Sequence, residues 1–273
     1  MKLGCDPEFF LFDSQKKTFV SADSLVPGTK EEPYPLKYGA VQVDGVAVEF
    51  NINPASSGEE FRHNIEKTLA EIRKMIPNRY EFKFKSCVEF PKEVWKDIPE
   101  TAKELGCSPD YNASKPLIVP NPPVSQYYAN LSKRTAAGHL HIGWTQNKNK
   151  FDPAHYWDCR QLTLELYKFF NPVQGMFDTS FYMRTSMYGN GPVFRPKEYG
   201  VEYRQLSNGW LKYPKVWSWL YDLISRLFSD LKENQSRLSK FLDEYRYKYT
   251  HEEAYSDFAR KYSFPQMPLN WRT

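Results

Sequence analysis

Two histidines one residue apart, His139 and His141, stand between Gly138 and Gly143 in the stretch R-T-A-A-G-H-L-H-I-G-W. On a β-strand, side chains two positions apart point to the same face, so both imidazoles would project together. A neutral imidazole is a ligand for divalent metals and a hydrogen-bond partner for phosphate or carboxylate. Such a pair also occurs in purely structural settings, so its interpretation depends on the other reactive stretches of the chain.

Two carboxylates, Asp6 and Glu8, repeat this spacing near the N-terminus. They lie in Lys2–Phe12, a run rich in Phe and Leu that predicts a strand with Gly4, Asp6 and Glu8 on one face. Like charges this close repel each other and raise a pKa unless a cation neutralises them, which favours a shared divalent metal. The alternative is a solvent-facing pair on an edge strand, because Pro7 cannot donate a ladder hydrogen bond.

A third carboxylate, Glu49, lies in a predicted hairpin. Ala40–Asn53 contains two alternating runs separated by Asp44-Gly45, a dipeptide typical of tight hairpin turns. Alternation places the large apolar residues after the turn on one face and Glu49, with its small neighbour Ala47, on the other. Glu49 is therefore either an exposed residue of a half-solvated sheet or a ligand that points into a cleft.

The fourth stretch combines a glutamate with arginines. Val201–Leu206 alternates, so Glu202 and Arg204 share a face, and a glycine-rich loop lies between Arg184 and Arg195. A Glu–Arg pair on one strand contributes little to stability when it is exposed. In a cleft, the planar guanidinium fork is suited to clamp a phosphate.

The elements that would position these side chains follow from the hydrophobic pattern. Apolar residues at helical spacing predict helices from Ser57 to Pro77, from Asp152 to about Phe170, from Lys212 toward Tyr249 and near Glu252–Tyr262. Alternation in Tyr80–Phe90 predicts one further strand. We expect one α+β domain over residues 1–273, in which residues 210–273 are mainly helical.

Composition is that of an ordinary globular protein. The 273 residues are 41% hydrophobic, 26% charged and 16% aromatic, and a net charge of +4 gives a pI near 8.6. This mild basicity is compatible with nucleotides, and the dispersed basic residues argue against nucleic acid as a partner. Aromatic rings that could line a pocket, or belong to the core, are those of Tyr111, Tyr127, Tyr128, Tyr188 and Tyr199.

Cysteine usage favours a reducing compartment. Cys5, Cys87, Cys107 and Cys159 form no C-x-x-C pair, so zinc-site spacing is absent and reduced thiols are expected. No apolar run approaches the ~20 residues that span a bilayer. The N-terminus has no basic stretch followed by an apolar region. We therefore expect a cytoplasmic protein that does not bind membranes, while its oligomeric state stays open.

Four predicted strands thus carry ligand-type side chains on one face each. Several carboxylates, an imidazole and an arginine fit a site where Mg²⁺ or Mn²⁺ bridges nucleotide phosphates, because hard oxygen ligands suit these ions. Arginine would offset the charge that develops on a transferring phosphoryl group.

Taken in order, these stretches resemble a known family. They are G-C-D-P-E-F-F, V-D-G-V-A-V-E-F-N, G-C-S-P-D-Y-N, G-H-L-H-I-G-W and F-R-P-K-E-Y-G-V-E-Y-R-Q-L-S-N, and together they span Gly4–Asn208. The order resembles that of the glutamine synthetase and glutamate–cysteine ligase superfamily. More closely it resembles the phage carboxylate–amine ligase family, type 2.

The resemblance implies a glutamine synthetase-like fold, with a largely antiparallel, curved sheet lining the active site and helices packed outside. It also implies a ligase that uses ATP to phosphorylate a small-molecule or peptide carboxylate, after which an amine displaces the phosphate to form an amide. The implied metal ligands are Asp6, Glu8, Glu49, His139 and Glu202. The implied contacts to phosphate are His141, Arg195 and Arg204, with Arg134 and Arg184 as weaker candidates, and Glu49, Arg195 and Arg204 would act in catalysis.

Two departures limit what the resemblance carries. The first motif has Asp6 where the enzymes often carry glutamate, which shortens one ligand by a methylene. The chain is also much shorter than glutamine synthetase and is expected to lack its separate N-terminal domain. Substrate specificity is therefore not implied.

Two other function classes stay open. A metal-dependent hydrolase would use the same face to activate water, although the arginines beside the carboxylates favour the ligase. A non-catalytic phage protein of the same fold would bind nucleic acid or a host protein through basic and aromatic residues. ATP turnover separates these classes, because a ligase converts ATP to ADP only when acid and amine are both present.

Overall fold

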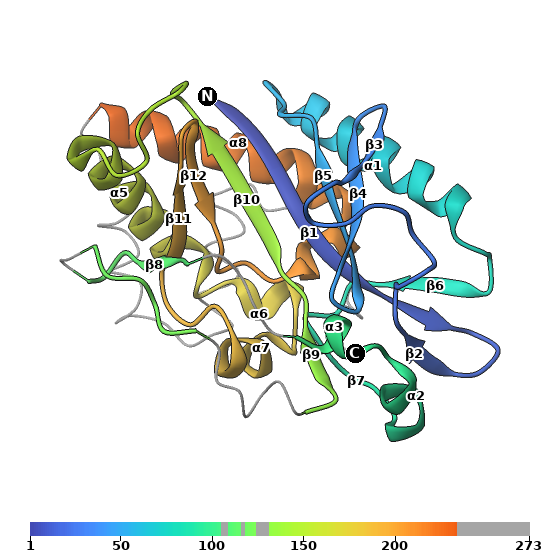
Figure 1. The fold of residues 1–273 in the computed structure, drawn as a ribbon. Coiled ribbons are helices and arrows are strands. Elements are labelled where there is room, and N and C mark those ends of the chain that lie inside the picture. The colour runs from blue at the N-terminus through green and yellow to red at the C-terminus, as the bar shows by residue number, and fades with distance from the viewer. Residues whose placement is uncertain (105–108, 116–117, 124–130, 234–273) are drawn as a thin grey trace.

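Strand β1 (Lys2–Asp13) lies at the centre of the computed structural model, which describes residues 1–104, 109–115, 118–123 and 131–233 (Figure 1). It pairs antiparallel with β10 (Gly138–Gly143) on one side and with β5 (Ala47–Ile52) on the other. The predicted strand is confirmed. The edge position that Pro7 suggested is wrong, because neighbouring strands flank β1 on both sides.

The other strands extend this arrangement into one antiparallel sheet. They are β2 (Thr18–Val20), β3 (Tyr34–Leu36), β4 (Gly39–Asp44), β6 (Tyr80–Lys83), β8 (Tyr111–Asn112), β11 (Val193–Lys197) and β12 (Gly200–Tyr203). The order in the described chain is β3-β4-β5-β1-β10-β12-β11-β8, and β2 and β6 pair with the last residues of β1. The terminal strands β3 and β8 do not pair with each other, so the sheet is open.

The predicted turn at Asp44-Gly45 joins β4 to β5. Gly45 has a φ of 58°, the left-handed conformation that a tight hairpin turn requires and that glycine adopts without strain. The register pairs Gln42 with Glu49 and Asp44 with Ala47. Paired residues of an antiparallel ladder share a face, so Gln42 and Glu49 are presented together.

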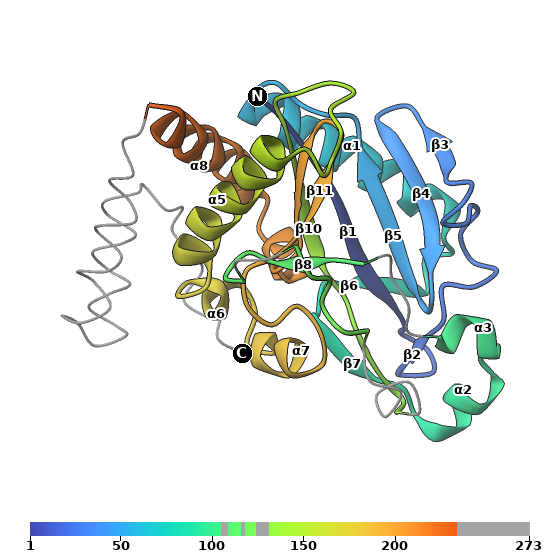
Figure 2. The ribbon, with the colours of Figure 1, turned by 60° about the vertical axis from the view of Figure 1, so that its left-hand side comes forward.

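Helices α1 (Gly58–Met75), α5 (Pro153–Phe170) and α8 (Pro214–Lys232) cover one face of the sheet (Figure 2). Shorter elements connect them to the strands: α6 (Gln174–Phe177), α7 (Phe181–Met187) and the 3₁₀ helix η1 (Asn208–Lys212). The strand pairings of the described residues are all antiparallel and the long helices lie against the sheet, so the expected α+β class is confirmed.

The starts of α1 and α5 are capped by side chains. Ser57 accepts a hydrogen bond of 3.1 Å from the backbone N–H of Glu60, and the Glu60 carboxylate accepts one from the N–H of Ser56. This reciprocal capping fixes the first turn of α1. At α5, the carboxylate of Asp152 accepts from the N–H of His155.

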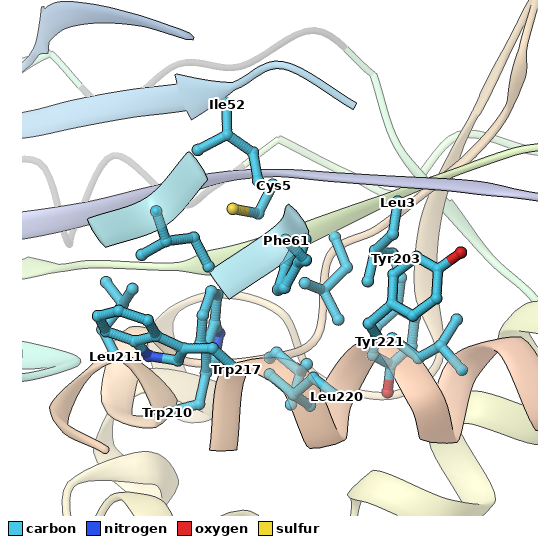
Figure 3. Packing of buried hydrophobic residues seen from close by; sticks show 14 of the residues in the cluster. Leu3, Cys5, Ile52, Phe61, Tyr203, Trp210, Leu211, Trp217, Leu220 and Tyr221 are labelled. Carbon is cyan, nitrogen blue, oxygen red and sulfur yellow. The ribbon is translucent and has the colours of Figure 1, made fainter. Parts of the chain in front are cut away.

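The main hydrophobic core lies between the sheet and these helices (Figure 3). Leu3 of β1 and Ile52 of β5 point toward Leu220 and Trp217 of α8, and all four side chains are buried. Burying a large apolar side chain contributes roughly 1.5–3 kcal/mol. This core therefore holds β1 rigidly on the helix side and leaves its other face for polar residues.

A second, smaller core lies at the end of the β4–β5 hairpin. Strands β7 (Cys87–Glu89) and β9 (Lys133–Thr135) form a separate two-stranded sheet, and α2 (Lys92–Asp97) and α3 (Glu100–Lys103) follow β7. Phe10, Val46 and Phe90 are buried in this cluster. It packs the hairpin turn against the α2–α3 segment.

The predicted single strand over Tyr80–Phe90 is wrong. Residues 84–86 interrupt it, and β6 pairs with β1 whereas β7 pairs with β9. The helix predicted from Lys212 is confirmed as α8, and its continuation toward Tyr249 and the helix near Glu252–Tyr262 lie outside the described residues. None of the described helices combines the length and apolarity needed to cross a membrane. A single domain remains a prediction.

Candidate active site

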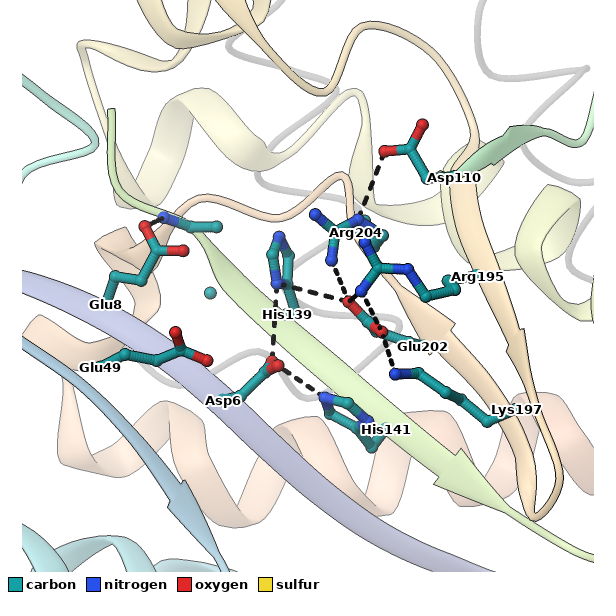
Figure 4. A network of polar contacts seen from close by, with 12 residues as sticks. Asp6, Glu8, Glu49, Asp110, His139, His141, Arg195, Lys197, Glu202 and Arg204 are labelled. Atoms are coloured by element: carbon teal, nitrogen blue, oxygen red, sulfur yellow. Dashed lines mark hydrogen bonds and ion pairs between the residues drawn. The ribbon is translucent and has the colours of Figure 1, made fainter. Parts of the chain in front are cut away.

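The face of the sheet opposite the helices carries the charged side chains (Figure 4). The register places Asp6 opposite His139 and Glu8 opposite Glu49. On the next strand, Glu202 stands opposite His141. The predicted strands are thus neighbours in space, and their ligand-type residues meet on one surface.

Asp6, His139 and Glu202 form the first group, called here the central trio. Nδ1 of His139 lies 3.6 Å from Oδ1 of Asp6 and 3.8 Å from Oε1 of Glu202. One potential ligand atom from each residue lies within 4.8 Å of the others. Nε2 of His139 is buried and has no hydrogen-bond partner among the described residues, whereas Oδ1 of Asp6 has the imidazoles of His139 and His141 beside it. A buried polar atom without a partner indicates a missing ligand.

Burial and neighbouring charges set the protonation of the central trio. Burial opposes ionisation of Asp6, but the charge of His141, whose Nε2 lies 2.9 Å from Oδ1, outweighs it and lowers the pKa of Asp6. Burial also opposes ionisation of Glu202, and Arg204 holds its pKa well below the usual range. Burial, helped by Arg204, lowers the pKa of His139 to about 4. At neutral pH the trio therefore offers two carboxylates and a neutral imidazole, which are metal ligands.

Glu8, Asp44 and Glu49 form the second group, called here the hairpin trio. Their carboxylate oxygens also lie within 4.8 Å of one another. Glu8 accepts a hydrogen bond of 3.0 Å from the N–H of Ala137, and the amide of Gln42 donates one of 3.0 Å to Glu49. These bonds fix two of the three carboxylates in the positions seen in Figure 4.

The hairpin trio carries more negative charge than its surroundings neutralise. Burial, followed by the charge of Asp44, raises the pKa of Glu8 to about 8. Burial, followed by the charges of Asp6 and Glu8, raises the pKa of Glu49 well above its usual range. Without an added cation, these carboxylates cannot all be ionised at neutral pH.

Three cations surround the carboxylate of Glu202. Arg195 donates to both oxygens, at 3.2 and 3.1 Å, and Lys197 lies 2.9 Å from Oε2. Arg204 contacts Oε1 and is itself 3.4 Å from Asp110. The predicted Arg195 and Arg204 thus stand beside the central trio, within reach of a ligand in the same cavity.

Arg134 and Arg184 line the same cavity but use their guanidinium groups on the protein. Arg184 is fully buried and donates to the carbonyls of Arg204 and Gln205. Arg134 donates to carbonyls in the segments around it, including that of Lys103. Their donors hold the backbone around the site in this structure, and the expected phosphate contact of both stays a prediction.

Two cavities meet at Asp6 and Glu49, which line both. The first, of about 360 Å³, contains both trios and the cations around Glu202. The second, of about 740 Å³, is bordered by His141, Trp144 and Tyr199. His141 is held between Asp6 and the hydroxyl of Tyr199, and although burial opposes its charge, Asp6 raises its pKa. His141 thus borders the second cavity beside Asp6, and its phosphate contact stays a prediction.

The tyrosines that were predicted as possible pocket walls lie in different places. Tyr188 lines the first cavity and contacts Arg204, and Tyr199 lines the second. Tyr111 belongs to the main core. Tyr127 and Tyr128 lie outside the described residues.

Sequence reasoning missed Asp44, Asp110 and Lys197. Asp44 was interpreted only as a turn residue, yet it shares a strand face with Gln42, and Gln42 pairs with Glu49. Lys197 lies two residues after Arg195, which pairs with Glu202, so alternation could have placed Lys197 at the site. Asp110 is in a loop, and no periodicity would have located it.

Both trios fit a divalent cation of the hard type. Carboxylate oxygens dominate, one neutral imidazole joins them, and the raised pKa values of Glu8 and Glu49 indicate a site that would accept positive charge. Cys5, Cys87 and Cys159 are buried free thiols and belong to neither trio.

Most residues that the sequence singled out therefore meet at one place. Asp6, Glu8, Glu49, His139, His141, Arg195, Glu202 and Arg204 surround the two adjoining cavities. Their arrangement can bind divalent cations next to a cluster of guanidinium and ammonium groups. Comparison with protein-family models and with curated proteins found no match to the chain.

Proposed function

We propose that this protein is an ATP-dependent carboxylate–amine ligase, with the glutamine synthetase-like fold of the family that its motifs resemble. It would form an amide or peptide bond through an acyl-phosphate intermediate. One observation carries the proposal: the metal-type central trio and a cluster of three cations share a single buried carboxylate, Glu202.

This combination matches the charge demands of phosphoryl transfer. Carboxylates are hard ligands for the divalent ion that accompanies ATP, and guanidinium groups stabilise the charge on the transferred phosphoryl group. A site that only activates water requires the metal ligands but no cluster of cations. Arg195, Lys197 and Arg204 therefore favour the ligase over the hydrolase.

The proposed cofactors are ATP and Mg²⁺ or Mn²⁺. Asp6, His139 and Glu202 would hold one ion, and Glu8, Glu49 and the newly located Asp44 a second. A bound ion neutralises phosphate charge and makes the transferred group a better electrophile.

The chain's own residues supply orientation and charge around that centre. Arg195 and Arg204 would hold the phosphoryl group against the acceptor carboxylate, which is how positioning lowers the barrier for transfer. Gln42 orients Glu49 through its amide, and the N–H of Ala137 orients Glu8. The proposed substrates are a small-molecule or peptide carboxylate and an amine. The proposed location is the cytoplasm, with no part for nucleic acid or membrane.

The test is ATP consumption with Mg²⁺ against a panel of amino acids, polyamines and peptides. Phosphorus NMR would follow ADP, and mass spectrometry would follow the product. We expect ADP only when an acid and an amine are both present, together with a product whose mass is the sum of the two minus water.

The matched variants are Glu49→Gln and Glu81→Gln. Glu49→Gln relieves repulsion within the hairpin trio and keeps a partner for Gln42, so it should fold while losing most turnover. Glu81 is a glutamate of β6 that pairs with Lys83 away from the site, and its replacement should change nothing. Metal-dependent hydrolysis of a substrate without ATP would contradict the ligase hypothesis and favour the hydrolase. Absence of nucleotide binding would favour the non-catalytic binding protein.

A further inference from the structure

Glu202 has more positive charge around it than one carboxylate requires. Its side chain is 1% exposed, and Arg195, Lys197 and Arg204 all lie within ion-pair distance of its oxygens. Asp110 offsets part of the charge of Arg204. The remaining positive charge is confined to the Glu202 side of the first cavity, away from the carboxylates of the hairpin trio, and this side attracts anions.

Lys197 differs from the two arginines in how it is held. Arg204 also contacts Asp110 and the hydroxyl of Tyr188, and Arg195 donates to the carbonyl of Pro109. By contrast, the ion pair of Lys197 within the described part of the chain is with Glu202. Its side chain is 30% exposed, compared with 18% for Arg195 and 5% for Arg204.

The backbone of Lys197 is nevertheless fixed. Its carbonyl accepts a hydrogen bond of 2.9 Å from Nε2 of His155, and Lys197 pairs with Gly200 in the β11–β12 ladder. Movement is therefore restricted to the side chain. A lysine carries a single point charge on a flexible four-carbon stem, so its ammonium can exchange one anion for another.

We infer that Lys197 is a phosphate-binding residue whose ammonium neutralises Glu202 before ligands bind and turns to a nucleotide phosphate when a divalent ion occupies the central trio. The ion adds positive charge beside Glu202, which repels the ammonium, while the phosphate chain adds the negative charge that attracts it. This inference rests on the proposed function, since a metal–nucleotide complex is the ligand. If Lys197 were only a structural counter-ion of Glu202, its removal would leave the affinity for polyphosphate unchanged.

The test compares Lys197→Met and Lys197→Arg with the control Lys83→Met in the full chain. Methionine keeps an unbranched stem without the charge, and Arg195 and Arg204 still neutralise Glu202, so the variant should fold. Lys83 is a matched control because it pairs with Glu81 at 2.6 Å and its side chain is 34% exposed. Calorimetry would measure binding of Mn²⁺ alone, of inorganic tripolyphosphate with Mn²⁺, and of ATP with Mn²⁺.

Lys197→Met should move two affinities in opposite directions. Loss of a like charge should tighten binding of Mn²⁺ alone by about threefold to tenfold. Loss of a charge-assisted contact should weaken binding of Mn²⁺–tripolyphosphate and Mn²⁺–ATP by about tenfold or more. The affinities of Lys197→Arg should stay within about threefold of those of the wild type. The affinities of Lys83→Met should equal those of the wild type.

The outcomes separate this role from the proposed function. Unchanged affinity of Lys197→Met for both polyphosphates would overturn the inference, even if the wild type is an active ligase. If Lys197→Met bound tripolyphosphate more weakly and the wild type did not bind ATP, the phosphate contact of Lys197 would be supported. The proposal that the ligand is a nucleotide would be contradicted. A wild type that binds neither polyphosphate would overturn both.

Discussion

Glu202 serves two neighbours at once, because it completes the central trio and is the common partner of Arg195, Lys197 and Arg204. Arg204 holds the pKa of this buried carboxylate well below its usual range, so Glu202 remains charged. Its charge therefore contributes to stability as well as to any chemistry at the site. This distinguishes it from Glu49, whose charge is opposed by its surroundings.

Glu202→Gln should lower the free energy of unfolding substantially. The amide cannot neutralise the surrounding cations, and breaking a buried ion pair by removing one partner costs about 3–5 kcal/mol. Urea unfolding, monitored by tryptophan fluorescence, would measure the loss. Activity of this variant has to be measured well below its unfolding midpoint, so that loss of turnover is not loss of folded protein.

The control for this prediction is Glu81→Gln, which removes a glutamate from an exposed strand pair with Lys83. Its unfolding midpoint should equal that of the wild type. A Glu202→Gln midpoint equal to both would show that the cations are solvated without their common partner, which contradicts the burial seen around Glu202.

Among the elements, alternation within a strand was readable from the sequence and pairing between strands was not. The period of two correctly placed Asp6 with Glu8, and Glu202 with Arg204, on shared faces. It could not show that β10 lies between β1 and β12, because that order depends on long-range pairing between segments about 60 residues or more apart. For the same reason Pro7 wrongly suggested an edge.

The arginines show a second limit of sequence reasoning. Arg184 and Arg195 flank the same glycine-rich loop, and the resemblance implied a phosphate contact for both, with Arg184 as the weaker candidate. Arg195 is on a strand, where the ladder fixes its direction toward Glu202. Arg184 is on α7, and packing of that helix turns it toward the carbonyls of Arg204 and Gln205. Tertiary packing of short helices is not encoded in local periodicity.

Gly200→Ala should disturb the junction of β11, β12 and β10. Gly200 has a φ of 149°, and an added Cβ would lie 2.1 Å from the carbonyl oxygen of Ile142 and 2.8 Å from ring atoms of Trp144. The strand would have to move away from β10, which carries His141 opposite Glu202. We expect a loss of about 2 kcal/mol or more of stability, together with weaker Mn²⁺ binding, measured by urea unfolding and calorimetry.

The matched control is Gly175→Ala in α6, where an added Cβ meets no atom within 4 Å. Alanine is the better helix former, so stability should stay equal or rise slightly. If Gly200→Ala behaved like Gly175→Ala in both measurements, the β10–β12 register would not be what positions Glu202.

At the scale of the whole molecule, the site places uncompensated positive charge on one side of β1 and uncompensated negative charge on the other. The cations around Glu202 exceed its charge, and the carboxylates of the hairpin trio repel one another. Binding a polyphosphate together with divalent ions would relieve both imbalances. The global stability of the protein should therefore depend on pH and on metal in a linked way.

Without metal, stability should fall as pH rises from about 6.5 to about 8. Glu8 keeps its proton in the folded protein up to a pKa of about 8, whereas the unfolded chain has lost it above the ordinary value of 4.5. Folding thus binds a proton in this window, and raising the pH favours unfolding. The lowered pKa of His139, about 4, has the opposite effect, but only below its ordinary value of 6.5. Saturating Mn²⁺ should remove the fall, because it favours the ionised carboxylates.

Glu8→Gln isolates this effect, because glutamine does not titrate in either state. Urea midpoints at pH 6.5 and 8, with EDTA or with Mn²⁺, would be compared for wild type and variant. The raised pKa values of His141 and Glu49 act in the same direction, because the stabilising charge of His141 is lost, and the proton held by folded Glu49 is lost, as pH rises, but both groups are common to both proteins. The variant should therefore show a smaller fall with EDTA and a smaller gain from Mn²⁺. If the urea midpoint fell equally in both proteins, Glu8 would already be ionised at pH 6.5. The hairpin trio would then need no cation to hold the charge of Glu8.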